Sequence, residues 1–108
     1  MKRYKCLIRE FQFLETEYHF AICSIQKSGS YYFVVWTNSK INIKVLYDET
    51  QENHVSILVY DADSLGTYAD VVEYQVEFSD STLKPSKQIE QASIWLRKAI
   101  SESIIKIK

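Results

Sequence analysis

Asp61 and Asp63, separated by one alanine, are the residues of this chain whose type and spacing best suit chemistry. On a β-strand, side chains two positions apart point to the same side and lie roughly 7 Å apart. Such a carboxylate pair can hold a divalent cation for phosphoryl transfer, which would make the chain a metal-dependent enzyme or a metal-binding domain. No glycine-rich phosphate loop, third carboxylate at a familiar spacing or activating lysine accompanies the pair. The simpler interpretation is therefore a solvated strand end that enters a turn.

The cysteines and histidines do not form a second catalytic or metal-binding group. His19 and Cys23 share one face of a predicted strand but stand about 13 Å apart along it, too far to bind one metal ion. Cys6 lies in a predicted helix and His54 in a polar loop, so no nucleophile with an adjacent base can be built from them. Two cysteines without close spacing are not a disulfide framework, and a reduced, cytoplasmic setting is expected. We expect no enzyme activity and no cofactor.

Charge is unevenly distributed along the chain, although its net value is only −1. Residues 1–44 hold seven Lys or Arg against three Glu, and residues 84–108 hold six against two. Residues 45–83 hold no lysine or arginine and nine carboxylates. These nine are Asp48, Glu49, Glu52, Asp61, Asp63, Asp70, Glu73, Glu77 and Asp80. Such segregation concerns partners and the electric field of the molecule, and it says nothing about the fold.

The acidic middle segment predicts a surface that captures a basic protein, because opposite charges steer and accelerate protein association. The predicted contact consists of eight carboxylates and one apolar anchor: Asp48, Glu49, Glu52, Asp61, Asp63, Asp70, Glu73, Glu77 and Trp36. The plainer alternative is that these carboxylates are solvated, or that they lie against the basic helices of the same chain. On the first interpretation the chain is a non-catalytic protein-binding module with an acidic surface.

Aromatic residues are abundant, with eight Tyr, five Phe and two Trp. On an exposed sheet face such side chains can stack nucleic-acid bases, but binders of that type also need basic neighbours. The strands after residue 45 are acidic, which disfavours phosphate, with Lys40 and Lys44 as the basic exceptions before them. A flat face with Tyr and Trp better suits protein binding. The partner is then another protein or a second copy, in which case the chain is a self-associating structural or adaptor protein and a homodimer.

Helical patterns stand at the two ends of the chain. Leu7, Phe11 and Leu14 form an apolar stripe in a helix predicted over residues 3–17. A last helix of roughly 20 residues begins at Pro85, which either takes its first position or precedes a Ser86 cap. Its apolar stripe is Ile89, Ser93, Leu96, Ile100, Ile104 and Ile107.

Strand patterns fill the region between the helices. Tyr18, Phe20 and Ile22 point one way, and His19, Ala21, Cys23 and Ile25 point the other way. Further strands are predicted over residues 31–36, 41–47 and 55–60. Residues 70–78 fit a strand or a helix, and their Val, Tyr and Phe content favours a strand. Short polar connections indicate antiparallel hairpins, so the fold class is α+β: a four- or five-stranded antiparallel meander with both helices on one face.

Size and composition indicate one ordinary globular domain covering residues 1–108. Hydrophobic residues make up 46% and charged residues 25% of the chain, as is usual for soluble proteins. The basic start is not followed by an apolar stretch of signal-peptide length, because Arg9, Glu10 and Gln12 interrupt it. No window is long and apolar enough for a membrane span. We therefore expect no membrane association.

Three segments resemble a known group of proteins. They are FQFLETEYHF at residues 11–20, VVWTN at residues 34–38 and INIKVLYD at residues 41–48. Over roughly residues 8–60, the chain resembles small bacterial α+β proteins of unassigned role, some of which are immunity proteins encoded beside polymorphic toxins. The resemblance implies a non-catalytic, cytoplasmic, toxin-neutralising role, and it transfers no binding residue, because members bind toxins through differing surfaces. An acidic surface would suit a basic nuclease toxin, whose active site must attract phosphate.

Overall fold

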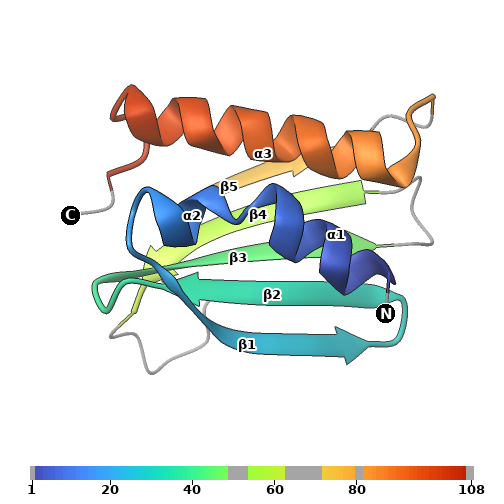
Figure 1. Cartoon of the computed structure of the whole chain (residues 1–108), viewed down its shortest axis with the longest axis horizontal. Coiled ribbons are helices and arrows are strands. Elements are labelled where there is room, and N and C mark those ends of the chain that lie inside the picture. Colours follow the sequence, from blue (N-terminus) through green and yellow to red (C-terminus); the bar gives the residue numbers. More distant parts are fainter. Residues whose placement is uncertain (1, 49–53, 63–71, 80–81, 107–108) are drawn as a thin grey trace.

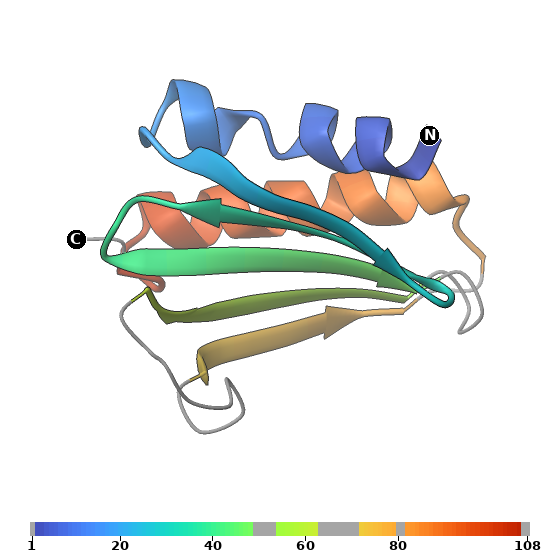
Figure 2. The same ribbon diagram turned by 90° about the horizontal axis from the view of Figure 1, so that it is seen from below.

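A computed structural model describes residues 2–48, 54–62, 72–79 and 82–106 of the chain. Within them, five strands form one antiparallel sheet in the order β1-β2-β3-β4-β5. The helices lie together on one face of the sheet (Figures 1 and 2). The elements are α1 (Lys2–Glu10), α2 (Phe13–Thr16), β1 (Ala21–Ser28), β2 (Tyr31–Thr37), β3 (Ile41–Asp48), β4 (His54–Asp61), β5 (Val72–Phe78) and α3 (Pro85–Ser101). The predicted α+β meander is confirmed.

The core lies between the helices and one face of the sheet. α1 contacts β2, α3 contacts β4, and the two helices contact each other. Every second residue of the central strands points into this layer, and the largest fully buried side chains include Trp36, Tyr47, Phe11 and Leu96. One contiguous apolar cluster therefore joins both helices to the sheet.

The first helix is shorter than predicted because the chain breaks at Phe11 and Gln12. Phe11, Phe13 and Leu14 are all buried, at 0%, 8% and 0% exposure. In a continuous helix, residues two positions apart lie on nearly opposite sides, so Phe11 and Phe13 could not both face the core. The tighter bonds at the break, such as Leu14 N to Phe11 O at 3.1 Å, turn Phe13 inward. The single helix predicted over residues 3–17 is therefore wrong in its second half.

A bulge in β1 alters the predicted alternation. Ile22 pairs with Trp36 and Ser24 pairs with Val35, which leaves Cys23 as an extra residue. Beyond the bulge, Ile25 pairs with the core residue Val34 and therefore lies on the same side of the sheet as Ile22. The prediction that Ile25 faces the other way is wrong, because one inserted residue exchanges the two faces of a strand. Buried Cys6 and exposed Cys23 are not joined by a disulfide.

A tight turn joins β1 to β2. Ser28 pairs with Tyr31, so only Gly29 and Ser30 form the loop. Gly29 has a φ of 61°, a conformation that side chains with a Cβ atom disfavour. A glycine in this conformation at the first loop position is typical of two-residue hairpins.

β5 resolves the alternative in favour of a strand over Val72–Phe78, the described part of the predicted segment 70–78. Ser56 pairs with Glu77 and Val59 pairs with Tyr74, whereas Tyr60 pairs with Val72. Glu73 is therefore an extra residue in a second bulge.

The last helix, α3, begins with Pro85 at its first turn and has no side-chain cap, so the Ser86 alternative is wrong. The predicted apolar stripe is buried as far as Ile100. The helix then ends at Ser101, and Ile104 is 55% exposed. Ile104 N bonds to Ala99 O at 2.9 Å and Ser103 N bonds to Ile100 O at 3.1 Å. This pair of bonds is a Schellman motif. Ser103, with φ 59°, occupies the left-handed position where glycine is usual.

Candidate protein-binding face

The predicted acidic residues begin with Asp48, which the structure buries. Its exposure is 1%, and Ser30 Oγ donates a hydrogen bond to Asp48 Oδ1 at 3.0 Å. This contact ties the turn between β1 and β2 to the end of β3. A buried, hydrogen-bonded carboxylate stabilises the fold locally and offers little to a partner. The prediction that Asp48 is an exposed contact residue is therefore wrong.

Asp61 and Glu77 are exposed but do not lie together. Asp61 ends β4 and pairs with Ile41, whose side of the sheet faces the helices. Glu77 pairs with Ser56, which faces away from the helices. Ser56 and Asp61 are five residues apart, or about 17 Å along the strand. The described carboxylates of the middle segment therefore do not gather on one surface.

The remaining predicted carboxylates do not decide between a partner-binding surface and carboxylates that are solvated or paired within the chain. Glu49, Glu52, Asp63 and Asp70 lie outside the described residues, and Glu73 is placed only as a backbone position in β5. Within the described part of the chain, no three His, Cys, Asp or Glu residues lie close enough to hold a metal ion. The metal site at Asp61 and Asp63 stays a prediction.

Trp36 is part of the core and is not a surface anchor. It is 0% exposed, and its ring lies 5.8 Å from that of Phe11. Its Nε1 donates a hydrogen bond to Glu15 Oε1 at 3.1 Å, which satisfies the indole and links β2 to α2. The apolar run over residues 31–36 showed that both faces of this strand are apolar, but it did not show which residues face the helices.

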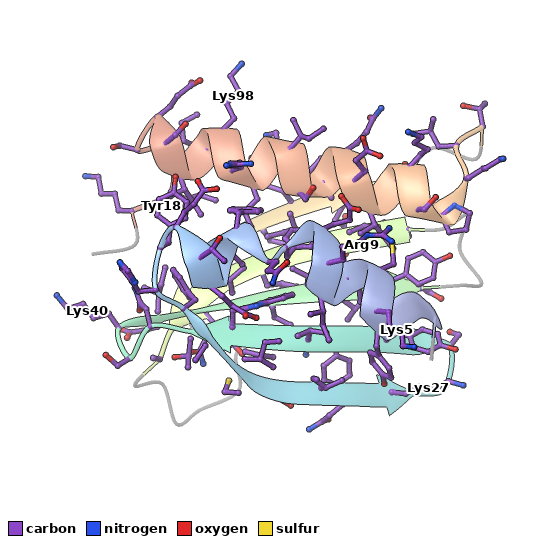
Figure 3. The ribbon with its side chains drawn as sticks, in the orientation of Figure 1. Lys5, Arg9, Tyr18, Lys27, Lys40 and Lys98 are labelled. Atoms are coloured by element: carbon purple, nitrogen blue, oxygen red, sulfur yellow. The ribbon has the colours of Figure 1, made fainter. Side chains whose placement is uncertain are left out.

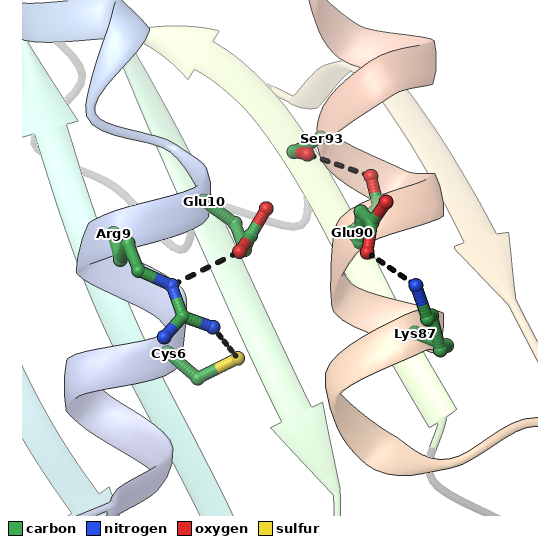
Figure 4. Close-up of polar contacts among 6 residues, drawn as sticks. All are labelled: Cys6, Arg9, Glu10, Lys87, Glu90 and Ser93. Carbon is green, nitrogen blue, oxygen red and sulfur yellow. Dashed lines mark hydrogen bonds and ion pairs between the residues drawn. The ribbon is translucent and has the colours of Figure 1, made fainter.

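The basic helices pair with acids of their own segments. Arg9 Nε lies 3.1 Å from Glu10 Oε2, and Lys87 Nζ lies 3.3 Å from Glu90 Oε2 (Figure 4). The other pairs are Arg97 with Glu17 and Lys98 with Glu102. Lys98 points outward from the helical layer in Figure 3. These four bases thus meet acids of the terminal segments, which argues against the alternative that they neutralise the acidic middle.

The second face of the sheet carries the side chains that alternate with the core residues. We call it the open sheet face, because no described helix or strand lies against it (Figure 2). On β2 to β5 its described side chains are Tyr31, Phe33, Val35, Thr37, Asn42, Lys44, Leu46, Asp48, His54, Ser56, Leu58, Tyr60, Gln75 and Glu77.

The centre of the open sheet face is apolar. Val35 and Leu58, each 6% exposed, are the cross-strand neighbours of Lys44 on either side. Phe33 pairs with Leu46, and the Lys44 Nζ atom lies 4.2 Å from the centroid of the Phe33 ring. Burial in this setting lowers the pKa of Lys44 below its ordinary value. The Lys44 ammonium therefore lies over an aromatic ring, with apolar residues as its cross-strand neighbours.

Polar groups mark the two ends of the same face. At one end Asp48 pairs with His54, whose Nε2 lies 3.4 Å from Glu77 Oε1. The Glu77 side chain is 56% exposed. At the other end, Asn42 Oδ1 is buried and has no hydrogen-bond partner among the residues that the structure describes. The face thus has the exposed carboxylate of Glu77 at one end and a buried amide oxygen at the other.

Sequence reasoning expected an aromatic sheet face suited to protein binding but did not identify the residues that form its centre. The alternation in residues 41–47 already set Asn42, Lys44 and Leu46 opposite the buried side of their strand. Strand pairing then adds Phe33 and Leu58 beside them, which alternation within one strand could not show.

Comparisons of the chain with protein-family models, with curated proteins and with solved structures found no match. Among the described helices, none has the length and apolar character needed to cross a membrane. The described residues form an α+β meander with one face covered by helices and one open sheet face.

Proposed function

We propose that this chain is a non-catalytic protein-binding module whose partner is a basic protein. The observation that carries the proposal is the open sheet face, with Phe33 and Leu46 in its centre and the exposed carboxylate of Glu77 at one end. Protein interfaces commonly combine an apolar centre, enriched in aromatic residues, with a polar rim. Tyr31, which is 40% exposed, adds an aromatic side chain at the Asp48 end of the same face.

The charge distribution supports a basic partner. The middle segment holds nine carboxylates and no lysine or arginine, while four bases of the helices pair with acids of the terminal segments. This excess of carboxylates in the sequence supports a negative field around the middle segment, which would steer a positively charged protein towards it.

In its particular form the proposal is an immunity-type inhibitor of a basic bacterial toxin, acting in the cytoplasm. The sequence resemblance supports this form, and so does the chemistry of nucleases, which need a basic surface to attract phosphate. A protein that blocks such a surface needs no catalytic group of its own.

The test uses the purified product of the adjacent gene in the source genome. We expect a complex on gel filtration, an affinity that falls as salt is raised, and loss of the partner's activity at equimolar inhibitor. No complex with that protein at low salt would reject the proposal. Thermal stabilisation by Mg²⁺, Mn²⁺ or Ca²⁺ would instead favour the metal site at Asp61 and Asp63.

A further inference from the structure

β1 is one edge of the sheet, and one side of its backbone has no neighbouring strand among the described residues. Ser28 and Tyr31 close the two-residue turn, and the residues that close such a turn bond to each other. Bonded pairs then alternate with pairs whose N–H and C=O groups point outward. Gln26 therefore bonds to β2, whereas Ile25 and Lys27 present their N–H and C=O groups at the edge. A strand is the element whose backbone matches such an edge.

The edge of β1 is regular over a short distance only. Beyond the bulge at Cys23, residues 24–28 pair one for one with residues 31–35, which gives five regular positions. Five residues of a strand span roughly 17 Å. A segment that adds to this edge is therefore short, because the hydrogen-bond ladder is interrupted at the bulge.

An apolar side chain is exposed on the same edge. Ile25 pairs with the core residue Val34 and so points to the helical side of the sheet, yet it is 47% exposed. The reason is that α1 lies over β2, and β1 lies beyond it in Figure 1. An apolar side chain of an added strand would become a cross-strand neighbour of Ile25 and cover it.

Two lysines give one end of this edge a positive charge. Lys27 is exposed, and its Nζ atom lies 5.1 Å from the centroid of the Tyr32 ring, against which Tyr4 of α1 packs edge-on. Lys5, the next residue of α1, is also exposed and lies at the same end of the molecule in Figure 3. Within the described part of the chain, neither lysine forms an ion pair. Carboxylates on an added strand would supply the opposite charge.

We propose that β1 binds an extended acidic segment of another protein, which adds to the sheet as a sixth strand along residues 24–28. Its backbone bonds to the outward groups of Ile25 and Lys27, an apolar side chain packs on Ile25, and carboxylates face Lys27 and Lys5. A second copy of this chain fits less well, because two paired β1 edges would bring the lysines of both copies together. This surface is separate from the open sheet face, and the inference goes beyond the proposed function.

The experiment titrates the whole chain with an eight-residue peptide in which Thr alternates with Glu or Val, and follows backbone amides by NMR and hydrogen exchange. The bound peptide should slow exchange of the Ile25 and Lys27 amides at least tenfold. The amide of Gln26 already bonds to β2, so its exchange should change little, and it is the internal control. No protection of the Ile25 and Lys27 amides, or shifts confined to the open sheet face, would overturn the inference.

Peptide variants separate strand addition from general charge attraction. A peptide with Lys in place of each Glu should bind at least tenfold more weakly. N-methylation of every second residue blocks one edge of the peptide, so one of the two alternate sets should abolish binding and the other should not. Equal binding of the acidic and basic peptides, or of the two methylated peptides, would contradict the inference.

Charge reversal in the protein locates the contact. Lys27→Glu should weaken binding of the acidic peptide about fivefold and strengthen binding of the basic peptide. Lys98→Glu on α3 is the matched control, because the Lys98 side chain is also exposed, at 73%, and lies on a different element. Equal effects of the two substitutions would overturn the inference. Sedimentation that shows a dimer whose Ile25 and Lys27 amides are already protected would assign the edge to a second copy and overturn it as well.

Discussion

Replacing Ser103 with glycine should stabilise the fold by about 0.5–1 kcal/mol. Ser103 has a φ of 59° at the end of α3, where its amide bonds to Ile100 O. A residue with a Cβ atom loses roughly 1–2 kcal/mol in this left-handed conformation, and glycine does not. Glycine has more freedom in the unfolded chain, which returns about 0.4–1 kcal/mol of that difference. The remainder is the expected gain.

The assay is urea denaturation followed by circular dichroism, with thermal unfolding as a second measurement. The expected gain corresponds to a rise in Tm of roughly 2–4 °C for a domain of this size. Ser101→Gly, two residues earlier, is the matched control. Ser101 is the last residue of α3, so glycine should cost about 0.5–1 kcal/mol there. If Ser103→Gly is neutral or destabilising while Ser101→Gly behaves as expected, the left-handed position is not a source of strain.

Three further substitutions test other parts of the structure. Gln88 is 2% exposed and its Nε2 lacks a hydrogen-bond partner, so Gln88→Met should raise the free energy of unfolding by about 1 kcal/mol. Gln91→Met, at an exposed position of the same helix, should change it by less than about 0.5 kcal/mol. Gly29→Ala should cost about 0.5–1 kcal/mol through φ and the unfolded chain together, since a Cβ there meets nothing within 4 Å; an unchanged urea midpoint would count against the turn geometry. Lys44→Met should be more stable than the parent at pH 7. Burial lowers the pKa of Lys44 in the folded state below 10.5, so its positive charge opposes folding at pH 7. As the pH rises towards 10.5 the amine loses its proton, and the difference in stability between Lys44→Met and the parent should shrink. A difference that stays constant in pH-dependent denaturation would contradict this.

The sheet order could be predicted because the signals for it are local. Alternating apolar residues and short polar connections specify strands and hairpins without knowledge of distant contacts. The strand at Val72–Phe78 follows from β-branched and aromatic residues, and Pro85 marks the start of α3 through its fixed φ. These features depend on residues only a few positions apart.

The side of the sheet on which an individual residue lies could not be predicted in the same way. The bulge at Cys23 depends on how β1 pairs with β2, and it moves Ile25 to the helical side. Trp36 lies in a run that is apolar on both sides, so its side is decided by its contacts with Phe11, at the break between α1 and α2, and with Glu15 of α2. Asp48 is buried because the turn at Ser30 lies beside the end of β3. Each outcome depends on contacts between segments distant in the sequence.

The candidate site also combines features that follow from the local sequence with features that depend on distant contacts. Segregated charge was visible in composition, but the positions of Asp61 and Glu77 on opposite sides of the sheet required strand pairing. The apolar centre of the open sheet face arises from three strands together, so no single segment of the sequence displays it.

The bulges in β1 and β5 have a consequence for growth of the sheet. These are its two edge strands, and each has one residue out of step, Cys23 in β1 and Glu73 in β5. A regular strand from a neighbouring molecule would keep its hydrogen-bond ladder only on one side of each irregularity. Both margins therefore resist strand-by-strand polymerisation, and a chain rich in β-branched and aromatic residues is protected from forming fibres.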